Sequence, residues 1–158
     1  APENLLKLSG MLRYMLYECN ADKVALKKEI EYIKNYIDLM LLKDSKGLNV
    51  ETDIEKDPPN LMIAPLLLIP FIENAFKHSN IEDIKKSWIK IKLKTSGNQL
   101  FFESRNSLPE GNFSKDKVGG IGLKNVKRRL ELLYPGKHQL QISDSPALFS
   151  VQLNLQLS

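Results

Sequence analysis

The sequence contains little of the chemistry that defines several common protein classes. It has one cysteine, Cys19, and two histidines, His78 and His138, in 158 residues. A single cysteine excludes an internal disulfide framework and suits a reducing compartment, and these three residues are too few for a zinc site built from cysteine and histidine. The longest apolar stretches, residues 39–42 and 66–76, are too short to span a bilayer.

The composition that remains is that of a soluble globular domain. Hydrophobic residues make up 42% and charged residues 27%, which excludes collagen-like, low-complexity and disordered chains. The net charge is +4, and the densest basic cluster comprises Lys124, Lys127, Arg128 and Arg129. This cluster is either a solvated helix face or a basic wall around a phosphate. It lacks the base-reading residues of a nucleic-acid-binding helix, so we expect no nucleic-acid partner.

Hydrophobic periodicity predicts two amphipathic helices at the beginning of the chain, over residues 3–17 and 25–43. The first carries a heptad-like seam, and the second carries one apolar stripe. The seam comprises Leu5, Leu8, Leu12 and Met15, and the stripe comprises Leu26, Ile30, Ile33, Ile37, Met40 and Leu41. We expect these helices to pack on each other or on a partner chain.

From residue 48 the period changes to two, which predicts a half-buried strand over residues 48–54. A third helix is predicted from Pro65, a favourable first-turn residue, to His78. Pro70 should distort its early turns. The rest of the chain predicts two hairpins with a helix between them. The first hairpin comprises strands 88–94 and 100–105 and is followed by a loop at 106–118, and the second comprises strands 139–143 and 148–157. The helix is predicted at 121–134, with Leu123, Val126, Leu130 and Leu133 facing the core.

This element order predicts an α+β fold. Because strands and helices do not alternate regularly, we expect a two-layer sandwich with a mixed, mainly antiparallel sheet and helices on one face, preceded by two helices. The change of pattern at residues 43–47 divides the chain into two helices at 1–44 and a sandwich domain at 45–158.

Polar residues interrupt the apolar third helix in one place. Glu73, Asn74, Lys77 and His78 lie along one stripe, because residues four apart are neighbours on a helix. Oxygen ligands from Glu73 and Asn74 suit magnesium, and Lys77 could reach phosphates as a point charge. The other interpretation is a solvated edge with an ordinary Glu–Lys pair.

A second candidate site is the glycine-rich segment Gly119-Gly120-Ile121-Gly122-Leu123, which opens the predicted helix at 121–134. Glycines allow close backbone approach, and a helix N-terminus attracts anions. The pattern is neither a Walker A loop nor a dinucleotide fingerprint, and a flexible loop ending in a helix cap would also explain it.

Together, these two segments carry a family resemblance. Residues 65–79, PLLLIPFIENAFKHS, resemble the N-box of LytS-type sensor histidine kinases, and residues 119–134, GGIGLKNVKRRLELLY, resemble their G-box. Residues 8–18 and 26–39 are similar to the dimerisation and connecting helices of that family. The resemblance thus implies that the helices at 1–44 are partial dimerisation and connecting helices. The resemblance covers nearly the whole chain and implies the Bergerat (GHKL) ATP-binding fold, with ATP and Mg²⁺ as cofactors.

The resemblance also implies roles for individual residues. Asn74 would ligate magnesium, Glu73 would ligate it or orient a bound water, and Lys77 would contact phosphate. Gly120 and Gly122 would give the triphosphate room at the base of a lid formed by residues 106–118. The family pattern also places His78, Leu123, Lys124 and Asn125 at the nucleotide site, with Arg129 beside it.

The sequence departs from the family pattern at two points. The usual phosphoacceptor histidine lies upstream of residue 8, so we expect none in this chain and no autophosphorylation of this polypeptide. The D-box aspartate, which accepts a hydrogen bond from the adenine amino group, is replaced by Asn106, and its glycine by Leu108. An asparagine oxygen still accepts, but the bond loses its charge assistance and about half its strength.

The resemblance thus predicts the catalytic fragment of a histidine protein kinase in two-component signalling. Its γ-phosphate acceptor would be a histidine on a missing upstream helix. The expected partners are a second copy through the N-terminal helices, the phosphoacceptor helix of the parent kinase and a response regulator of LytTR type. The expected location is cytoplasmic, with the parent protein anchored in the bacterial inner membrane. The alternative is a degenerate domain that serves as an interaction module with weak or no nucleotide binding.

Overall fold

A computed structural model describes residues 2–43, 48–79, 87–108 and 121–158. Its elements, in chain order, are α1 (Pro2–Leu16), η1 (Glu18–Asn20), β1 (Val24–Ala25), α2 (Leu26–Lys43), β2 (Asn49–Ile54), β3 (Met62–Ile63), α3 (Ile69–Ser79), β4 (Trp88–Ser96), β5 (Gln99–Ser107), α4 (Ile121–Leu133), β6 (His138–Asp144) and β7 (Leu148–Gln156).

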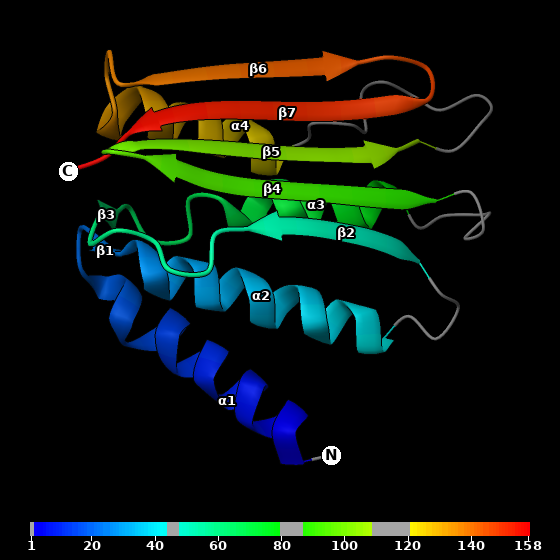
Figure 1. Cartoon of the computed structure of the whole chain (residues 1–158), viewed down its shortest axis with the longest axis horizontal. Coiled ribbons are helices and arrows are strands. Elements are labelled where there is room, and N and C mark those ends of the chain that lie inside the picture. The colour runs from blue at the N-terminus through cyan, green and yellow to red at the C-terminus, as the bar shows by residue number, and fades with distance from the viewer. Residues whose placement is uncertain (1, 44–47, 80–86, 109–120) are drawn as a thin grey trace.

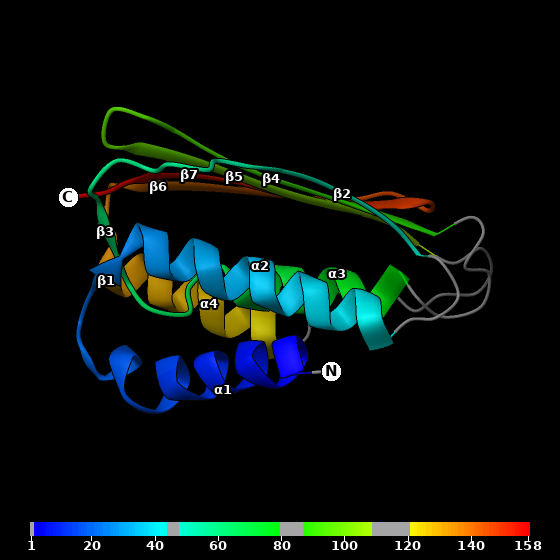
Figure 2. The ribbon, with the colours of Figure 1, turned by 60° about the horizontal axis from the view of Figure 1, so that its bottom comes forward.

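The elements form an α+β sandwich, as the sequence predicts. Five strands make one mixed sheet in the order β2-β4-β5-β7-β6, in which β2 and β4 are parallel and the other neighbours are antiparallel. Figure 2 shows α2, α3 and α4 beneath one face of this sheet, with α1 on the far side of α2. The short strands β1 and β3, which the periodicity did not predict, pair separately beside the helix layer.

Strand alternation separates the core from the solvent. Along β4 the side chains of Ile89, Ile91 and Leu93 are buried, whereas the lysines between them point away from the core. On β5, Phe102 packs against Phe71 of α3 with ring centroids 5.8 Å apart. The apolar stripe of α2 joins the same hydrophobic cluster, so these helices and the sheet share one continuous core.

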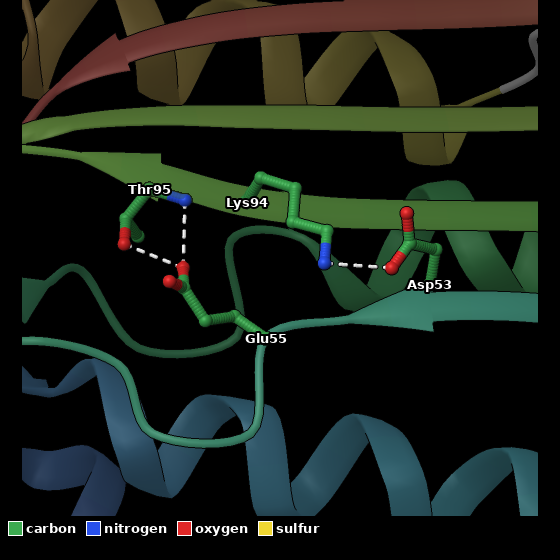
Figure 3. A network of polar contacts seen from close by, with 4 residues as sticks. All are labelled: Asp53, Glu55, Lys94 and Thr95. Atoms are coloured by element: carbon green, nitrogen blue, oxygen red, sulfur yellow. Dashed lines mark hydrogen bonds and ion pairs between the residues drawn. The ribbon is translucent and has the colours of Figure 1, made fainter.

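Polar contacts hold β2 at the edge of the sheet (Figure 3). The Asp53 carboxylate pairs with the Lys94 ammonium at 2.7 Å. Just after β2, the Glu55 carboxylate accepts the backbone N–H of Thr95 at 2.7 Å and also the Thr95 hydroxyl. These contacts fix the register of the parallel β2–β4 pair at the end of β2.

The predicted start of the third helix is wrong. The helix α3 begins at Ile69, not at Pro65, because residues 65–68 form a turn. Within it Leu66 adopts a φ of 56°, in the left-handed region, which cannot continue into a right-handed helix. Pro70 is the second residue of α3, where its missing N–H removes no helical hydrogen bond. The predicted distortion of the early turns by Pro70 is therefore wrong.

Two boundary predictions elsewhere are also wrong. Asn106 was assigned to a loop, but it lies in β5, which continues to Ser107. Leu133 was assigned to the core but is 51% exposed, and Tyr134 takes its place with 3% exposed. Residues 109–118 of the loop predicted at 106–118 lie outside the described residues.

The heptad-like seam of α1 does not pack on α2. Its four members are between 46% and 69% exposed, and α1 instead buries Met11 and Tyr14. Packing of the seam on the second helix is therefore wrong for this chain. Packing on a second chain stays a prediction.

Candidate functional site

The helix α3 presents the first group of candidate residues. Its apolar side is buried and contacts α4 and the strands β4 and β5. Of the polar stripe, Glu73 and Lys77 are exposed, Asn74 is half-buried and His78 is buried. No ion pair joins Glu73 to Lys77 in the described part of the chain, so the ordinary Glu–Lys pair is not formed.

Asn74 has the least satisfied side chain of this stripe. Its amide nitrogen Nδ2 is buried and has no hydrogen-bond partner among the described residues. A buried amide without a partner costs about 1–3 kcal/mol, so such a group persists where a ligand or another constraint requires it. The Asn74 amide and the adjacent Glu73 carboxylate supply oxygen donors of the kind that Mg²⁺ prefers, so these residues fit that ion.

The electrostatics around α3 reflect partial desolvation. Burial raises the pKa of Glu73. Burial, and then the Lys77 ammonium, lower the pKa of His78, so its imidazole is neutral at pH 7. Burial, and then the charge of Glu73, raise the pKa of Tyr36 on α2 to about 12. The ring of Tyr36 lies edge-on to Phe76 of α3, with centroids 5.9 Å apart, which fixes this helix against α2.

Asn106 occupies the penultimate position of β5 and is 1% exposed. Its register neighbours are the buried residues Ile89 and Phe149, one on each flanking strand. The amide nitrogen Nδ2 donates to the backbone carbonyl of Ser107 at 2.9 Å. This bond fixes the orientation of the amide group and leaves Oδ1 available as an acceptor.

The first turn of α4 contributes the described part of the glycine-rich segment. Leu123 is buried, and Gly122, Lys124 and Asn125 are exposed. Among the described residues, no atom lies within 4 Å of a Cβ placed at Gly122, so none of them excludes a larger residue there. Gly120 lies outside the described residues. In Figure 1, α3 and β5 end on the right of the molecule, and the first turn of α4 faces the same side.

Sequence reasoning missed a buried polar network beneath the start of α3. Arg129 of α4 donates from Nη2 to the Pro65 carbonyl at 3.0 Å and from Nη1 to the Leu66 carbonyl at 3.3 Å. The backbone N–H groups of Leu66 and Leu67 donate to the carboxylate of Glu29 on α2. A helical-period signal could have found Glu29, since it lies on the apolar stripe of α2 and is 2% exposed.

The same network reaches α1. The Tyr14 hydroxyl donates to the Glu29 carboxylate. Burial raises the pKa of Glu29, while Tyr14, the two backbone N–H groups and the Arg129 charge act in the opposite direction. The hydroxyl of Tyr134 accepts the backbone N–H of Ala64 at 2.9 Å, one residue before the turn.

Two features are absent from the described residues. These residues contain no group of three or more histidine, cysteine, aspartate or glutamate side chains placed to hold a metal ion. None of the helices in this part of the chain has the length and apolar character to cross a membrane.

Comparison with known sequences gives consistent matches. Residues 1–47 match the family model described as histidine kinase. The sensor protein LytS of Staphylococcus saprophyticus is 26% identical, with 90% of this chain and 26% of that protein covered. The sensor histidine kinase YpdA of Escherichia coli is 31% identical, with 85% of this chain and 25% of that protein covered. This chain therefore spans about a quarter of the length of the curated relatives it matches.

Solved structures agree on the fold. The histidine kinase domain of the Erythrobacter litoralis EL346 blue-light-activated kinase has a TM-score of 0.62 at 17% identity, with 98% of this chain and 73% of that chain covered. Acinetobacter baumannii AdeS has a TM-score of 0.59 at 19% identity, with 99% and 76% covered. The fold is thus the GHKL type found in histidine kinase catalytic domains. Together with the sequence matches, it supports a similarity of this chain to the catalytic region of LytS-type histidine kinases.

Proposed function

We propose that this chain binds Mg-ATP and is the catalytic part of a sensor histidine kinase that phosphorylates a histidine outside it. The observation that carries the proposal is Asn74. Its donor nitrogen Nδ2 is buried without a partner among the described residues, as expected of a group that waits for an acceptor such as a phosphate oxygen. It lies beside the exposed Glu73 carboxylate and one turn from the exposed Lys77 ammonium. Bound Mg-ATP would supply the transferable phosphoryl group, and these side chains would hold its charged end.

The residues of the chain divide the work by position. Asn74 and Glu73 would hold the metal, and Lys77 would offset phosphate charge. Asn106 Oδ1 would accept a hydrogen bond from the adenine amino group, since its Nδ2 is already bonded to Ser107. Catalysis by such a site is positioning and charge neutralisation, which needs no protein nucleophile in this chain.

The exposed seam of α1 supports a dimer as part of the same proposal. Leu5, Leu8, Leu12 and Met15 form one apolar face that α2 does not cover. A second copy would bury it, and a response regulator would then receive the phosphoryl group from the phosphorylated histidine. A regulator of the LytTR type and membrane anchoring of a longer parent protein in the bacterial inner membrane belong to the same proposal.

The test is isothermal titration of the chain with Mg-ATP, alongside Asn74→Ala and a matched control, Asn154→Ala. Asn154 is an exposed asparagine on β7. We expect binding by the parent chain and the control, and loss of binding in Asn74→Ala. Absence of binding by the parent chain would refute the proposal and favour the degenerate interaction module.

A further inference from the structure

The turn that precedes α3 has an unfavourable backbone conformation. Leu66 is the one non-glycine residue with a positive φ among the described residues. A left-handed conformation is unfavourable for an L-residue, and leucine has no side-chain hydrogen bond to offset that cost. Other groups must therefore hold the turn, and this turn sets where α3 begins.

Side chains from two other helices hold it. Arg129 of α4 reaches the carbonyls of Pro65 and Leu66, and Glu29 of α2 accepts the next two N–H groups. The donors and acceptors alternate along the turn, so neither side chain can substitute for the other. Removing either one leaves backbone groups without partners in a buried region, and the left-handed conformation of Leu66 loses its support.

The helix behind this turn carries the groups proposed to bind the metal and phosphates. Asn74 follows the first residue of α3 by five positions and Lys77 by eight. A shift in where α3 starts would rotate or translate both side chains, because a helix moves as a rigid element. Asn106 lies on β5 instead and would not move with it.

We propose that Glu29 and Arg129 are positioning residues for the phosphate end of the nucleotide: together they hold the 65–68 turn and thereby place Asn74 and Lys77. This inference rests on the proposed nucleotide binding. Tyr14, which donates to Glu29, extends the arrangement to α1. The helix that would form the dimer is thus connected, through the Glu29 carboxylate, to the turn that precedes α3.

The test separates the two ends of the nucleotide. Glu29→Leu keeps the side-chain size approximately but removes both acceptor oxygens from the two backbone donors. Arg129→Lys keeps the charge but cannot contact both carbonyls at once. Affinities for Mg-ATP and for adenosine are measured by competition with a fluorescent ATP analogue. We expect the affinity for Mg-ATP to fall about tenfold in both variants, and that for adenosine to change less than about twofold.

Controls keep the result interpretable. Asp38→Asn removes the exposed Lys7–Asp38 ion pair between α1 and α2, at 2.9 Å, and should leave both affinities unchanged. Thermal unfolding of each variant reports whether it folds. If the two variants fail to fold, Tyr14→Phe removes only the hydrogen bond that orients the Glu29 carboxylate against the turn, and it should weaken Mg-ATP alone by about two- to threefold.

Each outcome decides the matter. Weakened Mg-ATP binding with intact adenosine binding supports the positioning role. Equal losses for both ligands would show that the pair only stabilises the fold, and no loss for either would show that the turn does not place α3. If the parent chain itself binds neither ligand, the proposed function has failed, and the positioning role fails with it.

Discussion

Replacement of Asn106 by aspartate should change stability and nucleotide affinity in opposite directions. Asn106 is 1% exposed between Ile89 and Phe149, and its Nδ2 donates to Ser107 at 2.9 Å. In Asn106→Asp an oxygen replaces that donor and faces the Ser107 carbonyl. The lost bond and the unpaired buried acceptors should cost the free protein about 1–3 kcal/mol of unfolding free energy at pH 8.

With adenine bound, the charged acceptor should be the better one. A hydrogen bond to a charged group contributes about 1.5–3 kcal/mol, against 0.5–1.5 for a neutral pair. The difference of about 1 kcal/mol corresponds to Mg-ATP binding about fivefold tighter. Urea unfolding of the free protein and isothermal titration with Mg-ATP measure the two effects.

The pH dependence of this variant provides a further check. Burial should raise the pKa of the carboxyl introduced by Asn106→Asp in the folded variant above its value in the unfolded chain. The loss of unfolding free energy caused by its charge should therefore be absent at low pH and should grow as the pH rises through the folded pKa. Asn154→Asp, on the exposed face of β7, adds the same charge and should change neither quantity appreciably. An Asn106→Asp protein as stable as its parent at pH 8, with unchanged Mg-ATP affinity, would refute the assignment of Asn106 to the adenine.

Three further changes have defined outcomes. The buried hydroxyl of Ser104 has no hydrogen-bond partner among the described residues, so Ser104→Ala should raise the unfolding free energy by about 1 kcal/mol in urea titrations; a clear loss would contradict this. Because the pKa of His78 is lowered in the folded protein, the unfolded chain takes up a proton at a higher pH than the folded one does. The free energy of unfolding should therefore be independent of His78 above about pH 6.5 and should fall as the pH drops below that value. His78→Gln should remove that part of the fall, and identical pH profiles would argue against it. If α1 forms the dimer, Leu12→Glu should yield monomers in analytical ultracentrifugation, whereas Leu132→Glu, at an exposed position of α4, should not.

Much of the architecture followed from local patterns. Strand alternation predicted both hairpins, and helical periodicity predicted α1, α2 and α4, because each element has one buried face. The exact end of a helix is less visible in the sequence. Leu133 fits the apolar stripe of α4, yet Tyr134 fills that space, since its hydroxyl can also reach the N–H of Ala64.

The start of α3 could not be predicted, for a different reason. Pro65 is a good first-turn residue, and no local signal marks Leu66 as left-handed. Its conformation depends on Arg129 and Glu29, which lie far away in sequence, so only the tertiary structure reveals it. The candidate residues on α3 were visible because polar side chains interrupt an apolar helix. The residues that hold that helix were not visible as a group.

The parallel pairing of β2 with β4 has a consequence for the order in which the chain can fold. All the other pairs in the five-stranded sheet are antiparallel. The hairpins β4–β5 and β6–β7 close over short turns, whereas β2 can join β4 only after the chain has crossed through β3 and α3. The edge strand should therefore be the last to add to the sheet and the first to separate in partial unfolding.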